Sequence, residues 1–287
     1  MPNVQAFFDE ATNTVTYLVS DPVTHRAALI DPVLDYEPNA GALSTASVDE
    51  ILDVAAARAL EIIWALDTHA HADHLSAVDH VRRRTGARAG IGANITRVQA
   101  TFGPLFNAKD VNADGSVFDV LFEDNETFRI GELEAKVLYT PGHTPACVSY
   151  LIGDAVFVGD TLFMPDYGTA RADFPGGDAA MLYQSIRRIL SLSPEVRIFV
   201  GHDYLPESRT KHAWETTVAE QRADNVHVRE EVSERDFIAM RTKRDATLAA
   251  PRLILPSLQI NIRAGRLPPA EDDGETYLKI PVNRLAG

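Results

Sequence analysis

The chain has 287 residues, of which 45% are apolar and 24% charged, and its formal charge at pH 7 is −14. This composition is typical of a soluble globular protein, and no run of 18 apolar residues predicts a membrane span. The negative charge argues against nucleic acid and anionic membranes as partners, because long-range repulsion opposes the encounter. A single cysteine, Cys147, excludes an internal disulfide and, with no secretory signal, predicts a cytoplasmic protein.

Strand-like and helix-like segments alternate in the N-terminal third. Asn13–Asp21 and Arg26–Pro32 have strand composition, and Ser47–Leu60 has helical periodicity with Ser47 as its N-cap. Glu61–His69 is an almost wholly apolar run, which predicts a buried strand. The segment THAHADHLSA (68–77) begins where this strand ends, and in open α/β sheets ligands bind at such strand ends.

The rest of the chain continues with strands, helices and a tail. Two apolar runs around Gly153-Asp154 predict a tight hairpin. Ala249–Gly287 is expected to be an extended tail in which only Leu255–Gly265 is compact. We expect a core of residues 1–204, on which C-terminal helices and the tail, residues 205–287, pack to form a single domain. Further strands are predicted at Phe118–Asp124, Thr127–Gly131, Leu133–Thr140, Cys147–Gly153, Ala155–Asp160 and Arg197–Asp203, and helices at Asp178–Ser191, His212–Asp224 and Ser233–Leu248.

Five of the nine histidines lie in three separated stretches, each after an apolar strand. Neutral imidazole combined with carboxylate suits zinc, iron, manganese or nickel rather than calcium or magnesium. We therefore expect these side chains to converge around metal at one rim of a layered sheet. The set consists of His69, His71, His74, His143 and His202, with Asp73 and Asp160 beside them.

Ordinary structural roles are the alternative for individual residues. Any one member of the set could brace a ligand instead of binding metal, and Asp73 could cap a helix. Asp31 either braces the histidine loop or starts a turn. Cys147 lies in an apolar strand, where a thiol is usually inert. The remaining histidines, expected to be solvated or at the edge of the core, are His25, His80, His212 and His227.

The segment from His69 to His74, followed by His143, Asp160 and His202, resembles the H-x-H-x-D-H signature set of the metallo-β-lactamase superfamily. The resemblance runs in the right order through about the first 200 residues. It implies an α/β fold, the αβ/βα four-layer sandwich, in which two mixed sheets flanked by helices hold metal at one edge.

Within the superfamily, the chain is most similar to the persulfide dioxygenases and the bacterial β-lactamase-like hydrolases. The similar segments are Thr140–Tyr150, Ala170–Asp178, Gly201–Tyr204 and Asn261–Gly265. Glyoxalase II, a related hydrolase, typically has Glu where Asp203 stands and lacks the R-x-D-F segment, so the resemblance favours oxidation.

The resemblance to the dioxygenases implies one Fe(II) per chain, held by His69, His143 and Asp160. Two histidines and one carboxylate on one face leave positions open for O2 and a sulfur atom. The implied reaction oxidises glutathione persulfide, or a similar small thiol-derived substrate, with O2 to sulfite and glutathione. The residues implied as supporting groups or as a second metal site are His71, Asp73, His74 and His202.

Two further residues are implied to act on the substrate. Arg171 would pair with a substrate carboxylate, and Tyr204 would donate a hydrogen bond near the reacting sulfur. The alternative for Arg171 is a salt bridge within its own loop, through Asp173. The segment between Asp160 and Arg171 is two residues longer than in the resembling dioxygenases.

Other functions stay open. The same ligands could form a dinuclear zinc hydrolase of a thioester or lactone, with His69, His71 and His143 on the first metal and Asp160 bridging. Asp73, His74 and His202 would then hold the second metal. A metal-binding regulator without catalysis is a third possibility, and a homodimer is compatible with all three.

Overall fold

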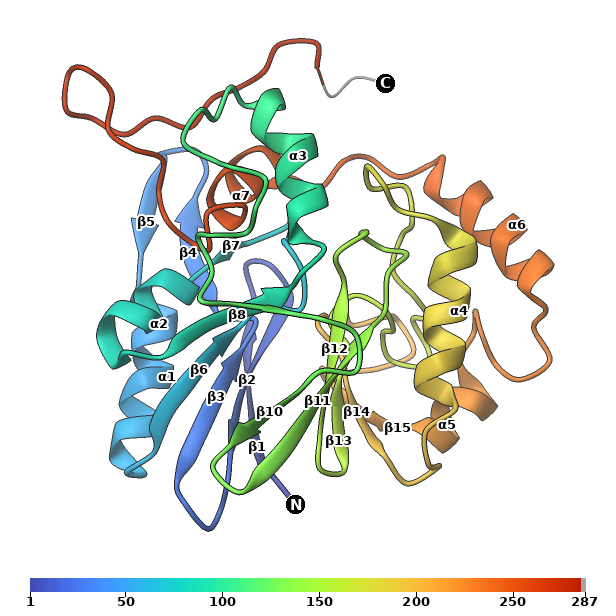
Figure 1. Cartoon of the computed structure of the whole chain (residues 1–287). Helices are drawn as coiled ribbons and strands as arrows, with labels where there is room; N and C mark the ends of the chain where they lie inside the picture. The colour runs from blue at the N-terminus through green and yellow to red at the C-terminus, as the bar shows by residue number, and fades with distance from the viewer. Residues whose placement is uncertain (285–287) are drawn as a thin grey trace.

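Two six-stranded sheets pack face to face in the computed structural model, which describes residues 1–284 (Figure 1). In the first sheet β1, β2 and β3 are antiparallel, and β3, β6, β8 and β9 are parallel. The parallel strands are apolar on both faces, as expected for strands covered on both sides. The strands in spatial order are β1 (Asn3–Asp9), β2 (Thr14–Ser20), β3 (Arg26–Ile30), β6 (Glu61–Leu66), β8 (Arg88–Gly92) and β9 (Val120–Phe122).

The second sheet is antiparallel except where β13 and β14 run side by side in parallel. The predicted hairpin is present, because Ile152 pairs with Ala155 across the two-residue turn. Gly153 in this turn has φ +60°, a conformation that glycine adopts without strain. The strands in spatial order are β10 (Thr127–Ile130), β11 (Leu133–Tyr139), β12 (Val148–Ile152), β13 (Ala155–Phe157), β14 (Arg197–Phe199) and β15 (Glu215–Thr217).

Helices cover the outer faces of both sheets. The core between the sheets contains Tyr17, Trp64, Phe122, Phe157 and Phe199, whose rings contact one another in two groups. This is the four-layer arrangement implied by the resemblance. Helices α1 (Ala46–Ala57) and α2 (Val78–Thr85) pack on the first sheet, and α4 (Ala179–Leu190) and α5 (Val218–Asp224) on the second. Helix α6 (Glu234–Asp245) packs on α4, and α3 (Ile95–Leu105) and α7 (Ile254–Asn261) lie together beyond the strand ends of the first sheet.

A small third sheet lies beside the first. It joins β5 (Ala42–Ser44), β4 (Val33–Glu37) and β7 (Leu75–Ser76). Because β7 lies at the end of the histidine segment, residues 68–77, its antiparallel pairing with β4 fixes that end.

Two local predictions were wrong. Helix α1 begins at Ala46, so Ser47 lies inside it and is not its N-cap. The helix predicted at 212–224 forms only from Val218, because residues 215–217 pair with β14 and Thr217 then caps the helix through Glu220. The compact part expected within the tail, Leu255–Gly265, is present, because α7 spans 254–261 and buries Leu258 and Ile260.

Residues beyond Tyr204 contribute to both halves of the sandwich. β15 extends the second sheet, α5 packs beside it and α6 on α4, and α7 packs against β7 of the small sheet next to the first. Within residues 1–284, none of the helices is both long and apolar enough to cross a membrane.

Candidate metal centre

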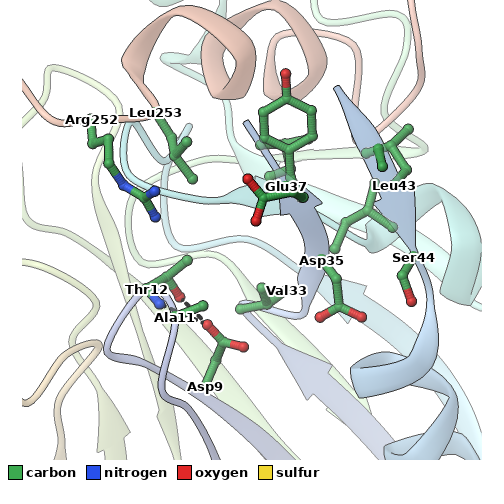
Figure 2. Close-up of a pocket in the computed structure, with 14 residues that line it drawn as sticks. Asp9, Ala11, Thr12, Val33, Asp35, Glu37, Leu43, Ser44, Arg252 and Leu253 are labelled. Carbon is green, nitrogen blue, oxygen red and sulfur yellow. Dashed lines mark hydrogen bonds between the residues drawn. The ribbon is translucent and has the colours of Figure 1, made fainter. Parts of the chain in front are cut away.

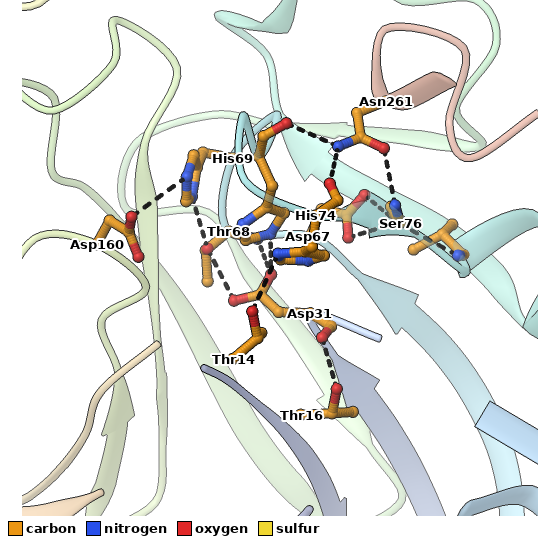
Figure 3. A network of polar contacts seen from close by, with 12 residues as sticks. Thr14, Thr16, Asp31, Asp67, Thr68, His69, His74, Ser76, Asp160 and Asn261 are labelled. Atoms are coloured by element: carbon orange, nitrogen blue, oxygen red, sulfur yellow. Dashed lines mark hydrogen bonds and ion pairs between the residues drawn. The ribbon is translucent and has the colours of Figure 1, made fainter. Parts of the chain in front are cut away.

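The histidine segment follows β6 and is fixed by Asp31 at the end of β3 (Figure 3). The Thr68 amide and hydroxyl donate to the two Asp31 carboxylate oxygens at 2.7 and 2.9 Å, and His71 Nε2 lies 3.0 Å from Asp31 Oδ1. Asp31 is buried and accepts from both neighbours. The sequence left two roles open for Asp31, and the structure shows that it braces the histidine loop.

The second sheet supplies the remaining members of the set. His143, Asp160 and His202 follow β11, β13 and β14, each in the loop after its strand. Gly159 permits the close approach of Asp160 to the histidine segment: its φ is +49°, and a Cβ there would lie 2.4 Å from Thr68 Oγ1. The expected convergence on one rim is confirmed.

Three residues form what we call the open group: His69, His143 and Asp160. Their ligand atoms lie within 4.8 Å of one another. Asp160 Oδ2 is 3.5 Å from His143 Nε2 and 4.0 Å from His69 Nε2. These separations suit two imidazoles and one carboxylate on a single ion.

Four residues form the closed group: His71, Asp73, His74 and His202. His202 Nε2 lies 3.0 Å from Asp73 Oδ2 and 3.3 Å from Asp160 Oδ1, but neither contact has hydrogen-bond geometry. Asp160 thus presents one oxygen to each group. Asp73 caps no helix, since α2 begins only at Val78.

Hydrogen bonds on the outer side of the rings orient the imidazoles. His143 Nδ1 donates to the Arg171 carbonyl at 2.8 Å, and His202 Nδ1 donates to the Asn13 carbonyl at 3.1 Å. A carbonyl can only accept, so the proton is on Nδ1 and the Nε2 lone pair points inward. His71 is reversed: Nε2 faces Asp31 and Nδ1 faces the centre.

Several inward atoms are buried and have no hydrogen-bond partner in the described chain. Leaving a buried polar atom unpaired is costly, so a cluster of such atoms indicates a missing ligand. All are nitrogen or carboxylate oxygen, the donor set that zinc and iron accept. The residues therefore fit a metal centre. The atoms are His71 Nδ1, Asp73 Oδ2, His74 Nε2, Asp160 Oδ1 and His202 Nε2.

The electrostatics keep His69, His71 and Asp73 in metal-binding form, whereas the burial of His202 is outweighed by Asp160 and Asp73, which raise its pKa. Burial, followed by neighbouring imidazoles, lowers the pKa of His69 and His71 well below the usual value. Burial raises the pKa of Asp73, but His202 and His74 outweigh it and hold that pKa well below normal. Neutral imidazoles and an ionised carboxylate are the states that bind a cation.

A pocket of about 350 Å³ opens onto the centre. His143, Asp160 and Asp73 line it on the metal side, whereas His71, His74 and His202 do not. Phe163 and Tyr167 line it from the segment after Asp160. The open group therefore faces a space that could hold a substrate.

Arg171 and Tyr204 both line this pocket. The Arg171 guanidinium is bound by Asp173 at 2.5 and 2.7 Å and donates to the Ala249 carbonyl at 2.7 Å. The Tyr204 ring stacks on His202 with centroids 5.6 Å apart. Tyr204 is 39% exposed, but desolvation by the surrounding protein and the nearby carboxylates of Asp73 and Asp160 raise its pKa, so its hydroxyl stays a donor.

A second pocket, of about 280 Å³, lies next to the first (Figure 2). The two pockets share Thr12, Arg252 and Leu253 as a common wall. Asp35 and Glu37 contribute carboxylates to the second pocket, and Arg252 points into it. A substrate longer than the first pocket could reach across this wall.

Some supporting residues were missed from the sequence. Asn13, in the turn before β2, contacts the outer nitrogen of His202, and Thr14, the first residue of β2, contacts that of His74. Asn261 of α7 contacts the backbone of the histidine segment. No local motif marks Asn13 or Thr14, whereas Asn261 begins one of the segments that carried the resemblance.

Residues outside the centre have structural roles. Asp203 is buried and pairs with Arg209 and His212, so it does not face the metal site. His80 pairs with Asp49 at 2.9 Å. Burial raises the pKa of the Cys147 thiol to about 12, consistent with an inert thiol.

Comparison with known proteins identifies the family. The metallo-β-lactamase superfamily model matches residues 10–202. A probable metallo-hydrolase of Burkholderia pseudomallei is 52% identical, with 98% of this chain and 99% of that protein covered. The β-lactamase hydrolase-like protein of Agrobacterium fabrum is 50% identical over 100% of this chain, which spans only 66% of that relative's length.

Proteins named ETHE1 are also similar. The human mitochondrial persulfide dioxygenase ETHE1 is 29% identical, covering 70% of this chain and 68% of that protein. The crystal structure of ETHE1 from Myxococcus xanthus has a TM-score of 0.75 and 32% identity, covering 92% of this chain and 100% of that one. The chain therefore belongs to the metallo-β-lactamase superfamily.

Proposed function

We propose that the protein is a non-haem iron dioxygenase that oxidises a small persulfide, such as glutathione persulfide. The observation that carries this proposal is the open group, two histidines and one carboxylate, of which His143 and Asp160 line a pocket. This ligand set leaves coordination positions free and is typical of Fe(II) oxygenases. Bound Fe(II) would supply the redox chemistry that brings O2 and the persulfide together.

The overall reaction balances with one water molecule. Glutathione persulfide, O2 and water give glutathione, sulfite and two protons. The sulfur–sulfur bond breaks and the terminal sulfur is oxidised, while O2 is reduced and contributes its oxygen atoms to the product. The protons leave to solvent through the pocket mouth.

The pocket suits an anionic substrate, although the whole protein is negatively charged. Arg244 and Arg252 line it, and within the described residues neither guanidinium forms an ion pair. Arg171 lies on the same wall and could exchange Asp173 for a substrate carboxylate. Tyr204 is a neutral donor beside the open group.

The similarity to ETHE1 supports the same proposal. The human relative is named a persulfide dioxygenase, and the Myxococcus xanthus ETHE1 structure matches nearly the whole chain. Asp203, which favoured oxidation in the sequence, carries no weight for the chemistry, because it points away from the metal centre.

A dinuclear metal hydrolase is the second candidate. It is favoured by the unpaired inward atoms of the closed group, which would suit a second ion bridged by Asp160. The relative with 52% identity is named a probable metallo-hydrolase. Two zinc ions sharing a water would lower its pKa to about 7 and generate a nucleophile.

Metal analysis combined with two assays separates these candidates. The protein purified from iron-supplemented cells should carry one iron per chain and consume O2 with glutathione persulfide. Two zinc ions per chain with hydrolysis of a thioester and no O2 uptake would favour the hydrolase. Metal binding without turnover in either assay would indicate a non-catalytic metal-binding protein.

A further inference from the structure

The C-terminal helix α7 reaches the histidine segment through one side chain, Asn261 (Figure 3). Asn261 is only 1% exposed and lies about two hundred residues further along the chain than the segment it contacts. A buried polar side chain is costly unless its hydrogen bonds are made.

All hydrogen-bonding partners of the Asn261 carboxamide belong to the histidine segment. Its Nδ2 donates to the carbonyls of His71 at 2.8 Å and His74 at 2.9 Å. Its Oδ1 accepts from the Ser76 amide at 2.8 Å. One planar group thus holds both ends of the turn that carries Asp73.

Only a carboxamide of this length satisfies the arrangement. A carboxylate would offer no hydrogen to the two carbonyls, and an aliphatic side chain would leave three buried backbone groups unpaired. The assignment of nitrogen and oxygen follows from the partners, because carbonyls accept and the amide donates.

The helix that carries Asn261 is itself anchored. Arg263 makes a two-point ion pair with Asp110 at 2.7 Å, and Gln99 of α3 donates to the Ile262 carbonyl at 3.0 Å. Gly265, with φ +82°, passes so close that a Cβ there would lie 2.7 Å from the Ser76 carbonyl. These contacts therefore hold Asn261 in a fixed position relative to the histidine segment.

We propose that Asn261 is a positioning residue of the metal centre, which holds the His71–His74 turn in its metal-binding shape before metal arrives. The entropy cost of ordering this turn is then met when the chain folds, so metal binding does not have to offset it. The inference rests on the metal centre but applies whether iron or zinc is the resident ion.

α7 offers a matched control in Gln259. It is also a buried amide, at 2% exposed, but it bonds the Leu255 carbonyl and both backbone groups of Lys279. Asn261→Asp and Gln259→Glu therefore make the same chemical change in one helix. Only the first change touches the histidine segment.

The experiment measures zinc affinity of the full-length, metal-free protein by competition with a chromophoric chelator, with thermal melting recorded for each variant. Zinc is the probe because histidine and carboxylate bind it in either group. Asn261→Asp should weaken zinc binding about 10- to 100-fold, as loss of supporting contacts does elsewhere. Gln259→Glu should bind zinc as the unchanged protein does.

Equal zinc affinity in Asn261→Asp and the unchanged protein would overturn the proposal, and so would equal weakening in both variants. A second readout needs no variant. In the metal-free, unchanged protein the Ser76 amide should exchange its hydrogen slowly. Fast exchange there would overturn the proposal that Asn261 holds the turn, even if Asn261→Asp fails to fold. Absence of zinc binding by the unchanged protein would instead overturn the metal centre.

Discussion

The open group and the closed group lie side by side and share Asp160, but they differ in access. His143 and Asp160 line the 350 Å³ pocket, whereas His71, His74 and His202 are buried behind them. Each imidazole of the closed group is also fixed on its outer side, by Asp31, Thr14 or Asn13.

This difference suggests a division of roles. A reaction needs ligands that a substrate can reach, and the open group places His143 and Asp160 on the pocket wall, whereas the closed group places only Asp73 there. The closed group has the ligands for a second ion, but its three imidazoles do not line the pocket, so it would support the first site or complete a bridged pair. Variants of the two groups should therefore have unequal effects.

The largest effect is expected from His143→Ala in the open group. It removes one of three ligands, so metal content and O2 consumption should fall together, the activity by more than about a hundredfold. Elemental analysis and oxygen electrode measurements check this. His80→Ala is the control, since His80 pairs with Asp49 away from the centre. Retained iron in His143→Ala would show that His143 is not a metal ligand.

A smaller effect is expected from His74→Ala in the closed group. If one ion in the open group performs the reaction, iron should stay near one per chain and activity should fall about tenfold, as for a supporting residue. A fall from two metal ions to one, with activity lost as completely as in His143→Ala, would show that the groups act as a dinuclear unit.

Arg171→Ala tests whether the pocket next to the open group binds the substrate through this guanidinium. The backbone carbonyl that orients His143 is unchanged, so metal should be retained. Loss of a charged hydrogen bond to substrate should raise KM roughly 10- to 100-fold. Asp173→Asn is the matched control, because it removes the partner of Arg171 but leaves the guanidinium; the same rise in KM in both variants would mean that Arg171 only braces its loop.

The smallest effect is expected from Tyr204→Phe. Loss of one neutral hydrogen bond should lower kcat about two- to tenfold, with metal content and KM unchanged. Tyr167→Phe serves as control, since its ring lines the same pocket 5.0 Å from that of Tyr204. Steady-state kinetics check this, and equal behaviour of the two variants would assign no donor role to Tyr204.

The sequence predicted the parts of the molecule that have local signals. Apolar runs such as Arg26–Pro32 and Glu61–His69 correspond to strands because burial on both faces selects such residues. The histidine and aspartate side chains could be predicted to meet at one rim because each stretch that carries them follows a strand. The family motif then supplied the four-layer arrangement, which composition alone does not encode.

Features that depend on distant contacts were not predicted. Residues 215–217 form a strand only because β14 offers an unpaired edge, which overrides the helical pattern around them. Asn13 contacts His202 only because the turn before β2 lies against the loop after β14. Asp203 appeared informative in the sequence, but its ion pairs with Arg209 and His212 exist only in the folded chain.

Oxygen uptake by the one-iron protein in the presence of glutathione persulfide is the most direct test of the central claim that the open group is the reaction centre of a dioxygenase. We expect O2 to disappear as sulfite forms in equal amount. Failure of the iron-loaded protein to consume O2, while the zinc-loaded protein cleaves a thioester, would contradict the account.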